Sequence, residues 1–212
     1  MSRTLLIAPI VMVAVAAGAF RPAGAGAPTD QLRGATDRVL EVLASPELAK
    51  PAKVEERRKL IRAVANQAFD WEETAKRALA RHWRALRNEQ REEFSALFAD
   101  LIERSYVGKI EAYSGEKIAY LGETVEGDQA TVRTQLVTRS GTQIPIDYRM
   151  QRETERWRVY DVLIEGVSLV SNYRTQFNKI VQQSGYEDLL KKLKTKQEEL
   201  LYEESGGGEK KP

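Results

Sequence analysis

The chain has 212 residues, with 33 lysines and arginines against 31 acidic residues, one histidine and no cysteine. This charge balance argues against a nucleic-acid-binding protein, which needs an excess of cations. The absence of cysteine excludes disulfides, thiolate chemistry and most zinc sites, so stability must come from an ordinary apolar core.

The first 25 residues have the layout of a secretory signal peptide. Arg3 is followed by an apolar run from Leu5 to Phe20 without an ionisable side chain. The run is about 16 residues long, whereas a bilayer-spanning helix needs roughly 20. Small residues then offer cleavage after Ala25, which we favour, or after Ala27. Export is therefore predicted, and a cut after Ala25 removes two arginines and leaves 31 basic residues against 31 acidic ones.

Apolar residues recur every three or four positions in the first half of the chain, which predicts helices. The predicted helical stretches are 32–43, 54–68, 71–79 and 88–106. Asp70, followed three residues later by Glu73, resembles a capping box for the third. Asn88 is a candidate cap for the fourth, which has the clearest amphipathic stripe.

From residue 117 the apolar period changes to two, which indicates strands. The expected strands are 118–120, 130–136, 144–150 and 157–164. Gly127-Asp128 and Ser140-Gly141 mark turns between the first three. The last strand has apolar residues at both odd and even positions and is therefore expected to be covered on both faces.

Helical spacing returns after Gly166, over 169–181 and 186–203. Residues 205–212 hold no apolar side chain and are expected to be a disordered tail. This order predicts an α+β fold in which a curved four-stranded antiparallel sheet is packed with helices and encloses an apolar cavity. We expect residues 26–204 to form a single domain.

Few residues are candidates for chemistry. His82 stands alone and cannot build a metal site, and a contact with a helix C-terminus explains it. Tyr160 and Asp161 could act as an acid and base pair, but adjacent strand residues point to opposite faces unless a bulge intervenes. No nucleotide-binding loop or zinc signature occurs. The sequence therefore predicts no catalytic residue, no metal site and no cofactor.

The segment 157–169, WRVYDVLIEGVSL, resembles a hallmark of the MlaC family, also called the toluene-tolerance family. Its W-x-x-Y-D-x-x-x-E-G-V-S pattern is long and specific. Residues 88–94, the region from Tyr106 to Gly115, and Gly185 followed by Leu189 also look like that family. The likeness covers about residues 32 to 195, while the Gly-rich, Lys-ended tail has no counterpart in it.

The resemblance implies an NTF2-like curved sheet with added helices, a periplasmic location and phospholipid as cargo. It also implies two partners, an inner-membrane ABC transporter complex with an MCE-domain protein and an outer-membrane lipoprotein complex. A hopanoid-associated branch of the family leaves a polycyclic lipid open as the cargo. We expect a monomer that binds no nucleic acid.

We expect the lipid's acyl chains to lie between the sheet and the flanking helices. The candidate liners, chosen for apolarity and periodicity, are Phe94, Leu97, Phe98, Leu101, Tyr106, Tyr113, Leu136, Tyr148, Val159, Val162, Val167, Leu169, Tyr173 and Phe177. Two other interpretations stay open. An NTF2-like enzyme would act on a small apolar substrate through Tyr160 or Asp161, and a chaperone or adaptor would bind polypeptide on an exposed apolar surface.

Overall fold

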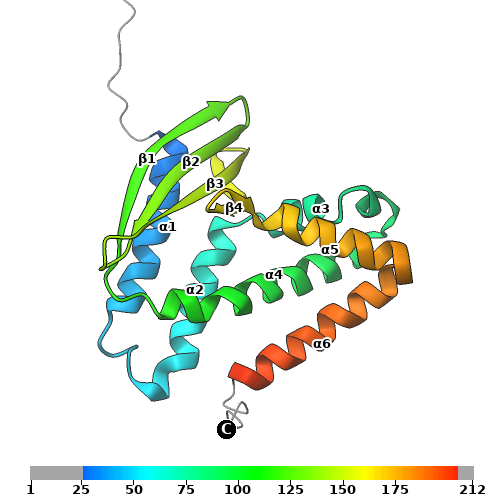
Figure 1. Cartoon of the computed structure of the whole chain (residues 1–212), viewed down its shortest axis with the longest axis horizontal. Helices are drawn as coiled ribbons and strands as arrows, with labels where there is room; N and C mark the ends of the chain where they lie inside the picture. Colours follow the sequence, from blue (N-terminus) through cyan, green and yellow to red (C-terminus); the bar gives the residue numbers. More distant parts are fainter. Residues whose placement is uncertain (1–25, 205–212) are drawn as a thin grey trace, which may run out of the picture.

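The computed structural model describes residues 26–204 (Figure 1). Its α-helices are α1 (Ala27–Ala44), α2 (Val54–Ala68), α3 (Trp71–Leu79), α4 (Asn88–Glu111), α5 (Leu169–Ser184) and α6 (Tyr186–Glu204), with 3-10 segments at Pro51–Lys53 and Ala80–Ala85. None of the helices in this range is both long and apolar enough to cross a bilayer. The predicted leader, residues 1–25, and tail, residues 205–212, lie outside the described residues.

The strands form one antiparallel meander in the order β1-β2-β3-β4-β5. They are β1 (Lys117–Glu126), β2 (Gln129–Val137), β3 (Gln143–Glu153), β4 (Arg156–Ile164) and β5 (Val167–Ser168). The predicted α+β class is confirmed, but the sheet has five strands rather than four. Glu165 (φ 52°) and Gly166 (φ 80°) make a tight hairpin that returns the chain to pair with β4. A two-residue strand is too short to leave a periodic signal in the sequence.

A bulge in β4 changes which side chains share a face of the sheet. Arg149 pairs with Asp161 and Met150 with Val159, so that Tyr160 is an extra residue on β4. Val159 and Val162 consequently both pack in the apolar cluster on the inner face of the sheet. Tyr160 and Asp161 both line a hollow outside that cluster. The bulge therefore removes the opposite-face arrangement that strict alternation predicts for these two residues.

Most of the buried apolar side chains of the described residues form two clusters. The sheet cluster consists of Leu32, Ala130, Val132, Met150, Trp157, Val159 and Val162, with Phe69, Tyr120, Ile146, Tyr148, Ile164 and Leu169 partly buried against it. The helical cluster is built around Leu79, Phe94, Phe98, Phe177 and Leu189, with Leu97, Tyr106 and Tyr173 partly buried against it. Figure 1 shows α1 along the sheet, and α3, α5 and α6 beyond the end of the sheet where β4 lies.

Candidate functional site

The structure divides most of the predicted liners between the two clusters. Those in or against the helical cluster are Phe94, Leu97, Phe98, Leu101, Tyr106, Tyr173 and Phe177, and those in or against the sheet cluster are Tyr148, Val159, Val162 and Leu169. Tyr113, Leu136 and Val167 belong to neither. Tyr113 lies after α4 and donates its hydroxyl to the carbonyl of Glu116 (2.8 Å), and Val167 is 61% exposed.

The two clusters meet where α5 begins. Leu169 packs against the sheet cluster, and the next residue, Val170, is buried in the helical cluster. Leu169 is only partly buried. A ligand between the clusters would therefore touch the first turn of α5.

An aromatic group fills the centre of the helical cluster. Phe94 and Phe98 are fully buried, and their ring centroids lie 5.6 and 5.1 Å from that of Phe177. The ring of Tyr173 packs edge-on against Phe98 at 5.0 Å. These edge and stacked arrangements are favourable for aromatic rings in a core. Phe94, Phe98 and Phe177 thus support the fold, and Tyr173 marks the accessible margin of the group.

Four tyrosines, in two neighbouring pairs, combine partial exposure with a desolvated hydroxyl group. Burial raises the pKa of Tyr148 to about 12, with the neighbouring Tyr120 adding to the shift. Burial likewise raises the pKa of Tyr120, Tyr106 and Tyr173, and the last two lie close enough to influence each other. Each residue is nevertheless only partly buried. These four rim tyrosines, two on each cluster, stand at the boundary between the apolar interior and accessible surface.

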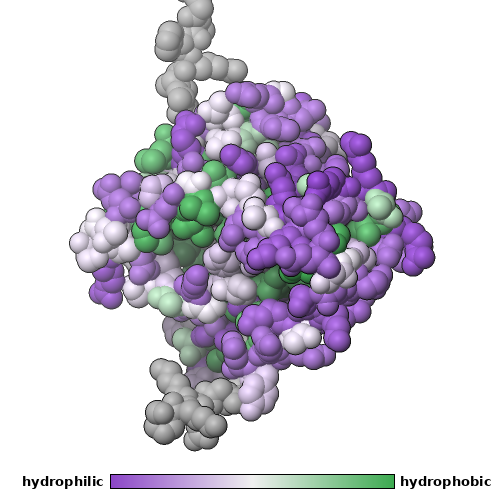
Figure 2. Space-filling model, turned by 45° about the vertical axis from the view of Figure 1, so that its right-hand side comes forward, coloured by the Kyte–Doolittle hydropathy of each residue, from purple (hydrophilic) through white to green (hydrophobic). Residues whose placement is uncertain are grey.

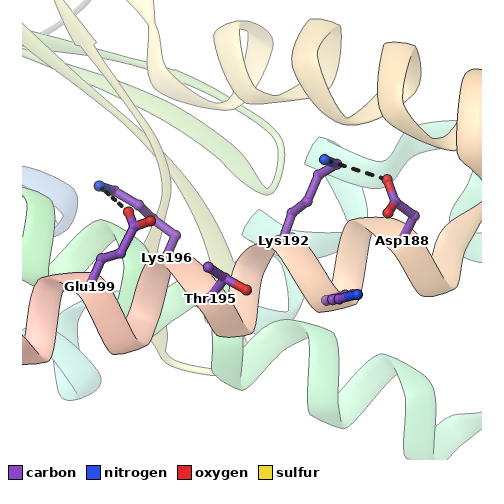
Figure 3. Close-up of a pocket in the computed structure, with 6 residues that line it drawn as sticks. Asp188, Lys192, Thr195, Lys196 and Glu199 are labelled. Atoms are coloured by element: carbon purple, nitrogen blue, oxygen red, sulfur yellow. Dashed lines mark hydrogen bonds and ion pairs between the residues drawn. The ribbon is translucent and has the colours of Figure 1, made fainter.

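Two hollows in the described part of the chain have polar walls. The first, of about 420 Å³, lies along α6 and is lined by Asp188, Lys191, Lys192, Thr195, Lys196 and Glu199 (Figure 3). Lys192 pairs with Asp188 (3.7 Å) and Lys196 with Glu199 (3.0 Å), as expected for a solvated helix face. The second, of about 320 Å³, lies beside Tyr160 and Asp161. Neither hollow is the predicted apolar cavity.

Asp161, the acid of the Tyr-Asp pair in the resemblance motif, lines the second hollow and has structural partners there. Asp161 is 4% exposed, and its carboxylate accepts hydrogen bonds from Ser168 Oγ (2.7 Å) and from the backbone N–H of Val170 (3.1 Å). Arg149 lies 3.3 Å away. Ser168 in turn caps α5 by accepting from the N–H of Ser171. Asp161 therefore fixes the start of α5, and its oxygens are already engaged by these groups.

The other polar candidates also have structural partners. Asp70 caps α3 by accepting from the N–H of Glu73 (2.9 Å), as the sequence predicts. His82 Nε2 lies 3.0 Å from Asn178 Oδ1 on α5. Across residues 26–204, no group of three or more histidines and acids is placed to hold a metal ion. The α4 helix begins at Asn88, which makes Arg87 its cap and displaces the predicted cap by one residue.

Glu103 on α4 is a buried acid opposite Arg62 of α2, whose Nε lies 4.0 Å from Glu103 Oε2. Burial raises the pKa of Glu103 to about 7, against the lowering effect of Arg62; Asp100 adds to the rise and Arg104 opposes it. The folded protein therefore holds a proton on Glu103 between about pH 4.5 and 7, where the unfolded chain has lost it. Folding stability falls as the pH rises through this window.

We expect Glu103→Gln, which cannot ionise, to raise the free energy of unfolding by about 1–2 kcal/mol at pH 8, after allowance for solvent screening. At pH 4.5 or below, the difference from the parent chain should nearly vanish. Urea unfolding at both pH values measures this. Glu55→Gln, at an exposed site, is the matched control. A Glu103→Gln effect of equal size at both pH values would contradict the assignment.

Hydrophobic residues reach the surface in recesses between hydrophilic ones on the face shown in Figure 2. Exposed apolar surface rimmed by polar residues is typical of binding sites for apolar ligands and partners. The arrangement suits apolar binding.

Comparison with known proteins gives three matches. The sequence profile of the MlaC protein family matches residues 33–195. The intermembrane phospholipid transport system binding protein MlaC of Haemophilus influenzae is 28% identical over 123 residues, which is 55% of this chain and 57% of that protein. The chain thus matches little more than half the length of that relative.

The third match is a solved structure, a phospholipid-binding protein from Ralstonia solanacearum in complex with a phospholipid. It superposes with a TM-score of 0.73 at 24% sequence identity and covers 83% of this chain and 99% of that one. At this identity the likeness shows a shared fold.

Proposed function

This chain belongs to the MlaC family, and on that premise we propose that it is a periplasmic phospholipid carrier that shuttles lipid between the outer and inner membranes. It holds the acyl chains between the sheet cluster and the helical cluster. The division of the apolar interior into these two clusters, which meet at Leu169 and Val170, is the observation that carries the proposal. The headgroup stays in water beyond the rim tyrosines.

The energetics of lipid transfer favour a carrier over free diffusion. Two acyl chains of about 15 methylenes each, at roughly 0.8 kcal/mol per buried methylene, cost on the order of 24 kcal/mol to expose to water. An apolar site that covers the chains recovers most of this free energy. Neither a nucleophile nor a cofactor is needed for that task.

The proposed site opens by separation of the two clusters. The two hollows described above have polar walls, so we infer that the acyl chains enter along the boundary between the clusters instead. The rim tyrosines suit this boundary because each combines a large apolar ring with a hydroxyl whose pKa is raised by burial, so that it stays uncharged. Lipid-bound protein should therefore expose these four residues less than lipid-free protein does.

The proposed partners are an inner-membrane ABC transporter complex with an MCE-domain protein and an outer-membrane lipoprotein complex. The Haemophilus influenzae relative is described as the binding protein of a transport system, which supports a carrier that works with other components. The carrier itself would act as a monomer.

Native mass spectrometry of the exported chain, purified without detergent, tests the proposal. We expect a mass increment equal to a phospholipid, which organic extraction removes. A polycyclic lipid in its place would assign the cargo to hopanoids. Bound peptide, or no increment after exposure to phospholipid vesicles, would contradict the carrier function.

A further inference from the structure

The start of α1 is fixed by an acid from the edge strand of the sheet. Glu123 of β1 accepts hydrogen bonds through Oε2 from the backbone N–H of Thr29 (2.9 Å) and from its hydroxyl (2.6 Å). Thr29 is 2% exposed. Gly26, the cap residue of α1, has no side chain to satisfy these groups. Glu123 therefore caps a helix that lies 94 residues earlier in the chain.

The other carboxylate oxygen of Glu123, Oε1, lies beside Gly26. A Cβ atom at this position would lie 1.8 Å from Oε1, so a side chain here would force the Glu123 carboxylate to move. Standard bond geometry then puts the nitrogen of Gly26 no more than about 4.3 Å from Oε1. A charged nitrogen at this position would need to move by at most a few tenths of an ångström to reach the ~4 Å range of an ion pair.

We propose that Glu123 is the binding site for a processed N-terminus, formed when the Ala25–Gly26 bond is cut. Water, delivered by the peptidase that removes the leader, adds across this bond and leaves a carboxylate on Ala25 and an α-ammonium group on Gly26. The ammonium pairs with Oε1 while Oε2 keeps both bonds to Thr29. The inference rests on the export that the proposed function requires.

The position of the cut follows from the geometry of α1. An ammonium group beside a helix N-terminus is opposed by the helix dipole, and the Glu123 carboxylate offsets that repulsion. A cut after Ala27 would instead remove Gly26, whose carbonyl accepts the N–H of Asp30 (3.0 Å), and the first residue of the helix. The structure thus favours the first of the two cleavage sites that the sequence offers.

Two measurements on the exported full chain test this site. The intact mass should correspond to a chain that begins at Gly26. A chain that begins at Pro28, or that keeps residues 1–25, overturns the proposal whether or not it carries lipid. Conversely, a correctly cut chain without lipid contradicts the proposed function alone, so the two failures are distinguishable.

The second measurement is the NMR titration of the α-amino group of the processed chain. An α-amino group ordinarily titrates near pH 8. We expect the value to rise by about one unit beside Glu123, which corresponds to a tenfold shift in the protonation equilibrium. Glu123→Gln should abolish the rise, whereas Asp128→Asn, in the turn between β1 and β2, should preserve it. The same titration in the parent and in Glu123→Gln would overturn the ion pair.

Discussion

The Leu169→Asp variant is expected to fold and to lose its phospholipid. Leu169 is the first residue of α5, where an acidic side chain is compatible with the helix dipole. It also lies at the meeting point of the two clusters, where an ionised carboxylate would contact the acyl chains. Burial of an unpaired charge in hydrocarbon costs several kcal/mol, so lipid occupancy should fall by about 100-fold or more. Native mass spectrometry and phospholipid extraction measure it.

Val167→Asp is the matched control for that variant. It introduces the same charge two residues earlier, at a side chain that is largely exposed and belongs to neither cluster. We expect it to retain phospholipid at the level of the parent chain. Circular dichroism and thermal melting verify that both variants are folded. Full lipid occupancy in a folded Leu169→Asp protein would show that the boundary between the clusters is not the binding site.

Asp161→Ala is expected to lower the free energy of unfolding by about 3 kcal/mol, because it leaves buried donors without an acceptor. The N–H of Val170 and the hydroxyl of Ser168 both lose their partner, and the start of α5 loses its anchor on β4. Urea unfolding, with the slope compared between variants, gives the difference.

Asp128→Ala separates this effect from the loss of a charge in general. Asp128 pairs with Arg152 at an exposed site, and such pairs contribute at most about 1 kcal/mol. Asp161→Asn, which keeps one carbonyl acceptor, should fall between the two. An Asp161→Ala protein as stable as the parent would contradict the capping role, and would return Asp161 to the candidates for a role in binding or catalysis.

Much of the fold could be predicted from periodicity. The α4 stripe and the alternation in β2 and β3 gave the right elements because each of these segments buries one face only. β4 is different, since it is apolar at both parities and contains the extra residue Tyr160. An alternating pattern cannot locate an inserted residue when both faces are apolar. The two-residue β5 was missed for a related reason, because it contains no full period.

The sequence selected apolar side chains for the candidate site but could not give their arrangement. Apolarity selected side chains that the structure does gather, such as Tyr148 and Tyr173, but it could not separate tightly packed rings such as Phe98 from those at an accessible margin. Val167 was selected for its apolarity and its place in the periodic pattern, yet it is exposed on the short strand. Exposure depends on how elements meet in three dimensions. Ser168 directly before a helical pattern is a typical N-cap residue, but no rule of sequence spacing connects it with Asp161, which the β4–β5 hairpin brings beside it.

The extra residue in β4 acts as a phase shift between the two halves of that strand. Deletion of Tyr160 would leave Val159, Asp161 and Val162 in strict alternation, paired with Met150, Arg149 and Tyr148 as they are now. Both valines would stay in the sheet cluster, and Asp161 would stay on the other face, where it anchors α5. A redesign of β4 can therefore remove the bulge without turning either half of the strand over.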